Sequence, residues 1–181
     1  MRHRIFVSAA LLLSPLFAAS AQPPQGTPAP KDVPIRIPAP HGEVLVLGER
    51  EKAFFYDDWH FASVRVADGI AYFSGIVVGA QGEPLDAAGF RAEAERVFRR
   101  IEEHLQALGA SSADIVSLQT FHVFGSKYFT GSKQTHLDAF RTAKDAVIKP
   151  PYPAWTAIGI AELLPERGLV EIQVTAHLPK R

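Results

Sequence analysis

The 181-residue sequence predicts an α+β fold in which two helices pack on one face of a mixed sheet. Three patterns support this prediction. Two runs of strand-forming residues meet at an Asp-Gly pair, which is typical of a tight hairpin. Two other segments repeat apolar residues at helical spacing, and a segment near the C-terminus alternates between apolar and polar residues. The predicted order is strand, strand, strand, helix, strand, helix, strand, strand.

The domain is expected to begin with three strands. A short apolar run at 44–48 predicts an edge strand. The runs 62–68 and 70–77 are joined by Asp68-Gly69, and both of these residue types tolerate the positive φ of a two-residue turn. These two runs are therefore expected to pair as a hairpin.

Two helices are expected, over 87–108 and over 132–148. In the first, apolar residues recur every three or four positions, as they do on one face of a helix. They are Phe90, Ala94, Val97, Phe98, Ile101, Leu105 and Leu108. Asp86 is a suitable N-cap and Gly109 a suitable residue just past the C-terminus. The second helix places four apolar residues on one face and stops at a pair of prolines.

The remaining strands are expected at 114–124, 154–164 and 169–178. The last of these alternates cleanly, so one face is apolar and the other polar. The apolar face carries Val170, Ile172, Val174 and Ala176. We expect both helices to cover this face of the sheet.

The opposite face of the sheet is expected to stay open. It carries Glu171 and Gln173, and we expect Leu169 and Trp155 to flank them. A half-polar face with apolar neighbours is typical of an interface between subunits.

Composition excludes several functions. Lysine plus arginine and aspartate plus glutamate number 19 each, and this balance argues against a nucleic-acid-binding protein. The absence of cysteine excludes disulfides, thiol nucleophiles and cysteine-ligated zinc. The histidines lack metal-ligand spacing, and neither a phosphate-binding glycine loop nor a Gly-x-Ser-x-Gly motif occurs. No metal and no cofactor are therefore expected.

The N-terminus predicts export. Residues 1–21 have the basic start, apolar run and Ala-x-Ala end of a signal peptide, although an uncleaved anchor is an alternative. After cleavage we expect a periplasmic or secreted protein without stable membrane insertion. The proline-rich segment 22–42 is expected to be a linker in which neither helix nor sheet propagates, or alternatively a ligand for a partner domain. The folded domain is expected over 43–181.

Several stretches together resemble the RidA/YjgF family of enamine/imine deaminases. They are 69–75 (GIAYFSG), 107–110 (ALGA), 112–116 (SADIV), 136–140 (HLDAF), 152–154 (YPA), 164–165 (LP) and 169–172 (LVEI). The resemblance covers about 55–178. It implies chorismate-mutase-like subunits that form a homotrimer, with small-molecule clefts between neighbours and no metal or organic cofactor.

The resemblance also implies site residues. Glu171 matches the glutamate that helps activate the attacking water, and Ser74 matches a strand-end serine of the site. Trp155 stands where the family has an arginine that clamps the substrate carboxylate. Phe61 falls at a frequent tyrosine and Gln134 near a frequent asparagine. An indole has one N–H donor and no charge, so the sequence predicts a substrate without the usual carboxylate rather than a 2-imino acid.

Alternatives remain open for each of these residues. Glu171 is a water-activating group or an exposed strand glutamate, Trp155 is a ligand wall or interface packing, and Ser74 donates to a ligand or to backbone. For the whole protein, hydrolysis of an imine- or enamine-like molecule stands against non-catalytic binding of a small ligand, and against docking of a protein partner. Three basic residues near the closing strands could replace the missing charge, but solvated positions suit them better. They are Arg167, Lys180 and Arg181.

Overall fold

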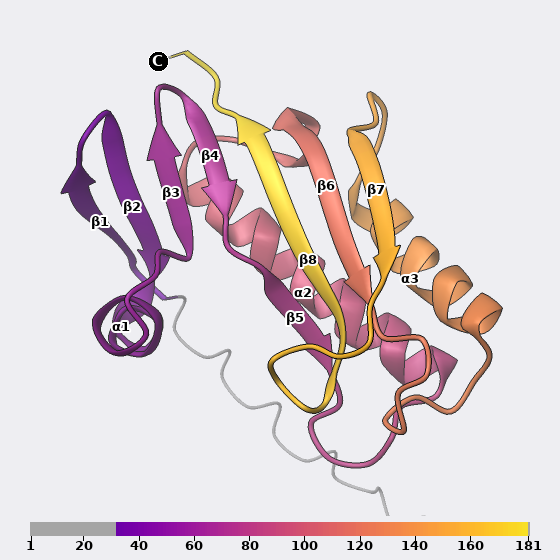
Figure 1. The fold of residues 1–181 in the computed structure, drawn as a ribbon. Helices are drawn as coiled ribbons and strands as arrows, with labels where there is room; N and C mark the ends of the chain where they lie inside the picture. Colours follow the sequence, from indigo (N-terminus) through magenta and orange to yellow (C-terminus); the bar gives the residue numbers. More distant parts are fainter. Residues whose placement is uncertain (1–31, 181) are drawn as a thin grey trace, which may run out of the picture. The chain divides into compact units, whose positions relative to one another are not determined.

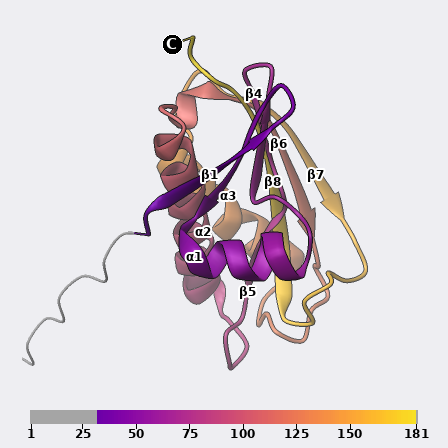
Figure 2. The ribbon, with the colours of Figure 1, turned by 90° about the vertical axis from the view of Figure 1, so that its left-hand side faces the viewer.

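The computed structural model describes residues 32–180. The predicted signal peptide at 1–21 and the first part of the predicted linker lie outside these residues. Two helices, α2 (Ala87–Ala107) and α3 (Lys133–Val147), pack on the same side of an eight-stranded sheet (Figures 1 and 2). Across 32–180, every helix is too short or too polar to cross a membrane.

The sheet has the order β1-β2-β3-β4-β8-β6-β7, and β5 pairs with β8 beyond the end of β4. The strands are β1 (Pro34–Ala39), β2 (Gly42–Leu47), β3 (Val64–Ala67), β4 (Ile70–Phe73), β5 (Ile76–Gly79), β6 (Ile115–His122), β7 (Ala154–Gly159) and β8 (Gly168–His177). Among these strands of residues 32–180, β6 and β7 run parallel and the other pairs are antiparallel. The predicted α+β fold, mixed sheet and placement of two helices on one face are confirmed.

Local signals explain where these elements begin and end. Asp68 and Gly69 have φ angles of 49° and 78°, as the tight turn between β3 and β4 requires. The Asp86 carboxylate accepts a hydrogen bond from the Gly89 N–H at 2.8 Å and caps α2. Gly109, just beyond α2, has a φ of 76° that favours glycine.

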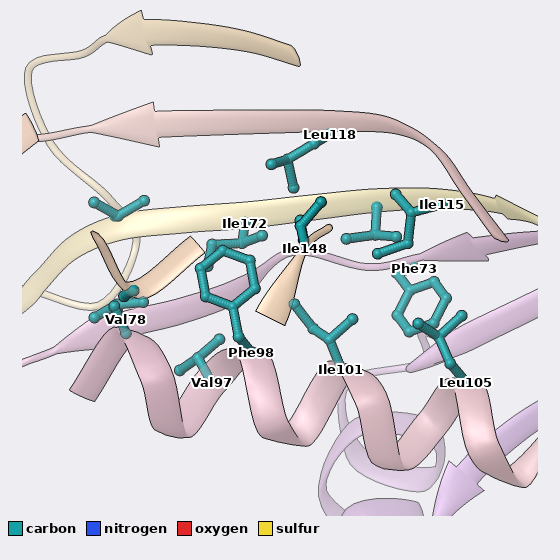
Figure 3. Packing of buried hydrophobic residues seen from close by; sticks show 14 of the residues in the cluster. Phe73, Val78, Val97, Phe98, Ile101, Leu105, Ile115, Leu118, Ile148 and Ile172 are labelled. Carbon is teal, nitrogen blue, oxygen red and sulfur yellow. The ribbon is translucent and has the colours of Figure 1, made fainter. Parts of the chain in front are cut away.

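The core lies between α2, α3 and the sheet. Figure 3 shows Phe98, Ile101 and Leu105 of α2 turned toward the sheet, where Phe73 and Ile172 also contribute to the core. The predicted alternation of β8 holds, because its apolar residues are buried and the intervening ones are at least partly exposed from 171 onward. Neither α2 nor α3 covers the opposite face of the sheet (Figure 2). Burial of one face thus sets the strand register.

The prediction that no sheet forms over 22–42 is wrong at β1, which pairs with β2 along its whole length. Pro34 and Pro38 lie four residues apart, so both fall in the same phase of the strand. In an edge strand that phase can direct its missing N–H groups away from the partner, so no ladder hydrogen bond is lost. The folded unit therefore begins about ten residues before the predicted boundary at 43.

A helical segment between β2 and β3 was not expected. It comprises α1 (Gly48–Glu51) and a π-helix, η1 (Lys52–Asp58), and a 3₁₀ turn, η2 (Ser112–Asp114), precedes β6. The Glu51 carboxylate reaches the buried His104 of α2 at 3.2 Å, which ties α1 to the core. The other side chains of this segment are mostly exposed, so they leave no apolar helical period in the sequence.

Candidate functional site

Glu171 lies in β8, close to the break between the two strands that pair with one side of β8. Strands β4 and β5 both pair with β8, and Ser74-Gly75 forms the break between them. The Glu171 carboxylate fills the space that a side chain at 75 would need, because a Cβ added to Gly75 would lie 1.8 Å from Glu171 Oε1. The glycine therefore lets this carboxylate rest directly on the backbone.

The Glu171 carboxylate is chemically uncommitted. Its residue is partly buried on the open face of the sheet. Among residues 32–180, no basic side chain forms an ion pair with it. Such a carboxylate can accept a proton from a nearby water.

Ser74 precedes Gly75, on which this carboxylate rests, and Phe61 precedes Ala62, whose carbonyl Ser74 contacts. The Ser74 hydroxyl donates to the Ala62 carbonyl at 2.6 Å, and the Ser74 N–H donates to the Ser63 carbonyl at 3.0 Å. The Ser74 donor is thus used within the fold, while its lone pairs can still accept. Phe61 is 36% exposed and its ring packs on Phe55 of η1 with centroids 4.9 Å apart. We call Phe61, Ser74, Gly75 and Glu171 the carboxylate half-site.

Trp155 lies on the other side of the sheet. It pairs with Leu118 of β6, which in turn pairs with the buried Val174 of β8, so Trp155 shares the helix-covered side. Its ring is 39% exposed and packs against Phe140 of α3 at 6.2 Å. The expectation that Trp155 flanks Glu171 on the open face is therefore wrong. The side of an edge strand is set by its register, which the sequence of that strand does not contain.

The expectation that Leu169 flanks Glu171 on the open face is also wrong. It is fully buried in the core rather than exposed beside Glu171. It lies at the β-bulge, between Gly168 and Val170 of β8, which pair with the consecutive Gly79 and Val78 of β5, so the simple alternation of β8 is lost there.

A buried polar chain leads inward from Trp155. The indole N–H donates to the Thr120 hydroxyl at 3.0 Å, and this oxygen lies 2.8 Å from His122 Nε2. His122 Nδ1 lies 3.1 Å from His136 Nε2. Within the described part of the chain, His136 Nδ1 has no partner although the ring is completely buried.

Burial sets the protonation of these two rings. Loss of water on burial, and to a lesser extent the nearby His136, together lower the pKa of His122 to about 4. Burial likewise lowers the pKa of His136 to about 4. Both rings are therefore neutral near pH 7, as the surrounding phenylalanines require.

A lysine and a tyrosine complete the surroundings of Trp155. The Lys144 ammonium lies 5.0 Å from the centre of the Trp155 ring and 5.9 Å from that of Tyr152. We call Thr120, Lys144, Tyr152 and Trp155 the indole half-site. Lys144 was not predicted as a site residue, although it falls four residues after Phe140 on the buried stripe of α3.

Gln134 joins neither half-site within one chain. It is exposed in the first turn of α3, where its amide donates to Asp138 at 3.1 Å. Ten residues separate it from Lys144, which corresponds to roughly 15 Å along a helix. One chain thus holds two separate half-sites, with Gln134 at a third position.

Comparisons with known proteins fit this fold. The family model described as Endoribonuclease L-PSP matches residues 58–178. The RutC family protein YjgH of Escherichia coli is 26% identical over 124 residues, which are 67% of this chain and 86% of that protein.

Two of the solved structures that match the chain illustrate the shared fold. The structure of protein YJGH has a TM-score of 0.55 and 23% identity, over 71% of this chain and 91% of that one. RidA from an Antarctic Psychrobacter has a TM-score of 0.52 and 23% identity, over 65% of this chain and 88% of that one. The matched family region begins after β1, β2 and α1, so these elements precede it.

Proposed function

The chain belongs to the RidA/YjgF family, and on that premise we propose that it hydrolyses an imine- or enamine-like small molecule at clefts between copies of the chain. The observation that carries the proposal is the uncommitted carboxylate of Glu171 beside Gly75. Water would attack the imine carbon while Glu171 takes a proton from it. Protons delivered to nitrogen then release ammonia, and the carbon keeps the oxygen as a carbonyl group.

The placement of the two half-sites supports a site that needs a second copy. Glu171 and Trp155 lie on opposite sides of one sheet, so one ligand cannot touch both in the same chain. All six residues of β7 are exposed, and β7 has β6 as its only strand partner within 32–180. We propose that this edge meets the carboxylate half-site of a neighbour, and that three copies close the ring.

Non-catalytic binding of a small ligand is the second candidate, and Trp155 favours it. An indole in place of a guanidinium gives up a charged, bidentate contact. The two candidates are separated by imines generated in situ from several amino acids. Hydrolysis predicts faster release of the oxo product than in buffer, whereas pure binding predicts saturable binding with no acceleration.

The trimer makes a direct prediction. Light scattering of the 19.8 kDa chain at micromolar concentration is expected to give a mass of about 59 kDa. The mass of a single chain would contradict both the trimer and the shared cleft.

Replacing Gly75 with alanine is expected to displace the Glu171 carboxylate. The clash falls on the flexible end of a side chain, so unfolding free energy should change by less than about 1 kcal/mol. Hydrolysis should fall by about tenfold or more, because a shift of roughly 1 Å removes the carboxylate from the water.

Gly82→Ala is the matched control, since nothing lies within 4 Å of a Cβ added there. Both variants are compared by steady-state rates and by urea unfolding. Equal rates for Gly75→Ala and wild type would show that the position of this carboxylate does not matter.

A further inference from the structure

Lys144 is an unusually placed cation. Only 9% of the residue is exposed, yet lysine is rarely buried without a charged partner. Its ammonium pairs with Asp145, whose side chain is half exposed. The pair therefore lies near the surface, at the C-terminal end of α3, where the helix dipole favours a positive charge.

The Lys144 ammonium has more N–H donors than its partner within residues 32–180 uses. It carries three N–H donors, and Asp145 is its hydrogen-bond partner among residues 32–180. The rings of Trp155 and Tyr152 stabilise a cation through their faces but accept no conventional hydrogen bond. Donors are thus left for an anion.

The aromatic neighbours of Lys144 leave its ammonium accessible to a ligand. Tyr152 is 68% exposed and Trp155 39% exposed, so a ligand can lie on these rings and approach the ammonium between them. The indole itself is held in place by its hydrogen bond to Thr120. Charge and apolar surface are therefore presented side by side.

We propose that Lys144 is the carboxylate-binding residue of the indole half-site, and that the ligand joins a carboxylate to an apolar body that stacks on Trp155. This inference rests on the proposed function for the place of Trp155 in the cleft. It revises the expectation of a ligand without a carboxylate. Unlike a guanidinium fork, an ammonium makes a single-point contact, so carboxylates in varied orientations are accepted.

The test uses binding rather than turnover. The fluorescence of Trp155 reports binding in a Trp59→Phe background, because the chain has only these two tryptophans. The probes are 2-oxobutanoate and its uncharged methyl ester. Lys144→Met should raise the Kd of 2-oxobutanoate about tenfold or more and leave that of the ester within about twofold, because a charge-assisted contact is lost.

Two further variants separate charge from packing. Lys144→Arg should keep 2-oxobutanoate binding within about threefold of the parent, because the charge is retained. Lys133→Met is the matched control and should change nothing, since Lys133 also belongs to α3 and lies over an aromatic ring, Phe124 at 4.7 Å.

The proposal is overturned if the parent does not bind 2-oxobutanoate up to its solubility limit. It is also overturned if Lys144→Met weakens the binding of 2-oxobutanoate and of its ester equally, or if it weakens the binding of neither. Hydrolysis of imines is measured separately on the same proteins. Lys144-dependent binding without hydrolysis would reject only the proposed function, whereas hydrolysis with unchanged binding in Lys144→Met would reject only this inference.

Discussion

Glu171→Gln is expected to lower the rate of imine hydrolysis by about 100-fold or more while leaving the fold and the subunit mass unchanged. Glutamine keeps the shape of the side chain and an acceptor oxygen, but it cannot take a proton from water. The carboxylate has no ion-pair partner among residues 32–180, so its neutralisation leaves no buried charge unpaired. The effect should therefore appear in rate and not in stability.

The matched control is Glu103→Gln on α2, which removes an exposed carboxylate paired with Arg100 at 3.0 Å. It should leave the rate within about twofold, because α2 packs on one side of the sheet (Figure 2) and Glu171 lies on the other side, out of phase with the buried residues of β8. Rates are followed as release of the oxo product. Full activity in Glu171→Gln would show that Glu171 takes no part in the hydrolysis.

Acid is expected to destabilise the protein strongly between pH 6.5 and pH 4. Burial holds the pKa of both His122 and His136 near 4, whereas an unfolded chain would protonate them near 6.5. In this window the unfolded chain binds protons that the folded chain does not bind, so stability falls as the pH falls. The loss should approach about 3 kcal/mol for each ring and level off below pH 4.

Urea unfolding at pH 7, 6, 5 and 4 and at one protein concentration measures this loss. His122→Gln combined with His136→Phe should remove most of the pH dependence in this window. His41→Gln, at a side chain that is 74% exposed, should leave it unchanged. An equal slope in the double variant and the wild type would show that these rings do not carry the effect.

Much of the fold follows from local patterns. The Asp68-Gly69 turn, the cap at Asp86 and the alternation of β8 each depend on neighbouring residues, and each is found where the sequence indicated it. β1 was not predicted because prolines break helices and central strands, although they are tolerated in an edge strand. The helical segment after β2 was not predicted because its sequence has little apolar periodicity.

The site was only partly predictable for a different reason. Glu171 and Ser74 were identified through family motifs, and the structure brings both to the break between β4 and β5. The side of the sheet that Trp155 occupies depends on its pairing with β6, a non-local choice. Lys144 carries no motif, and only its packing on Trp155 marks it.

Mixed assembly tests the shared cleft most directly. Glu171→Gln disables the carboxylate half-site and Trp155→Ala the indole half-site, so each variant alone should be nearly inactive. If every cleft takes one half-site from each of two copies, equal coexpression should restore activity to about one quarter of wild type, because one cleft in four then has both halves intact. Coexpressed protein no more active than either variant alone would contradict a cleft shared between two copies.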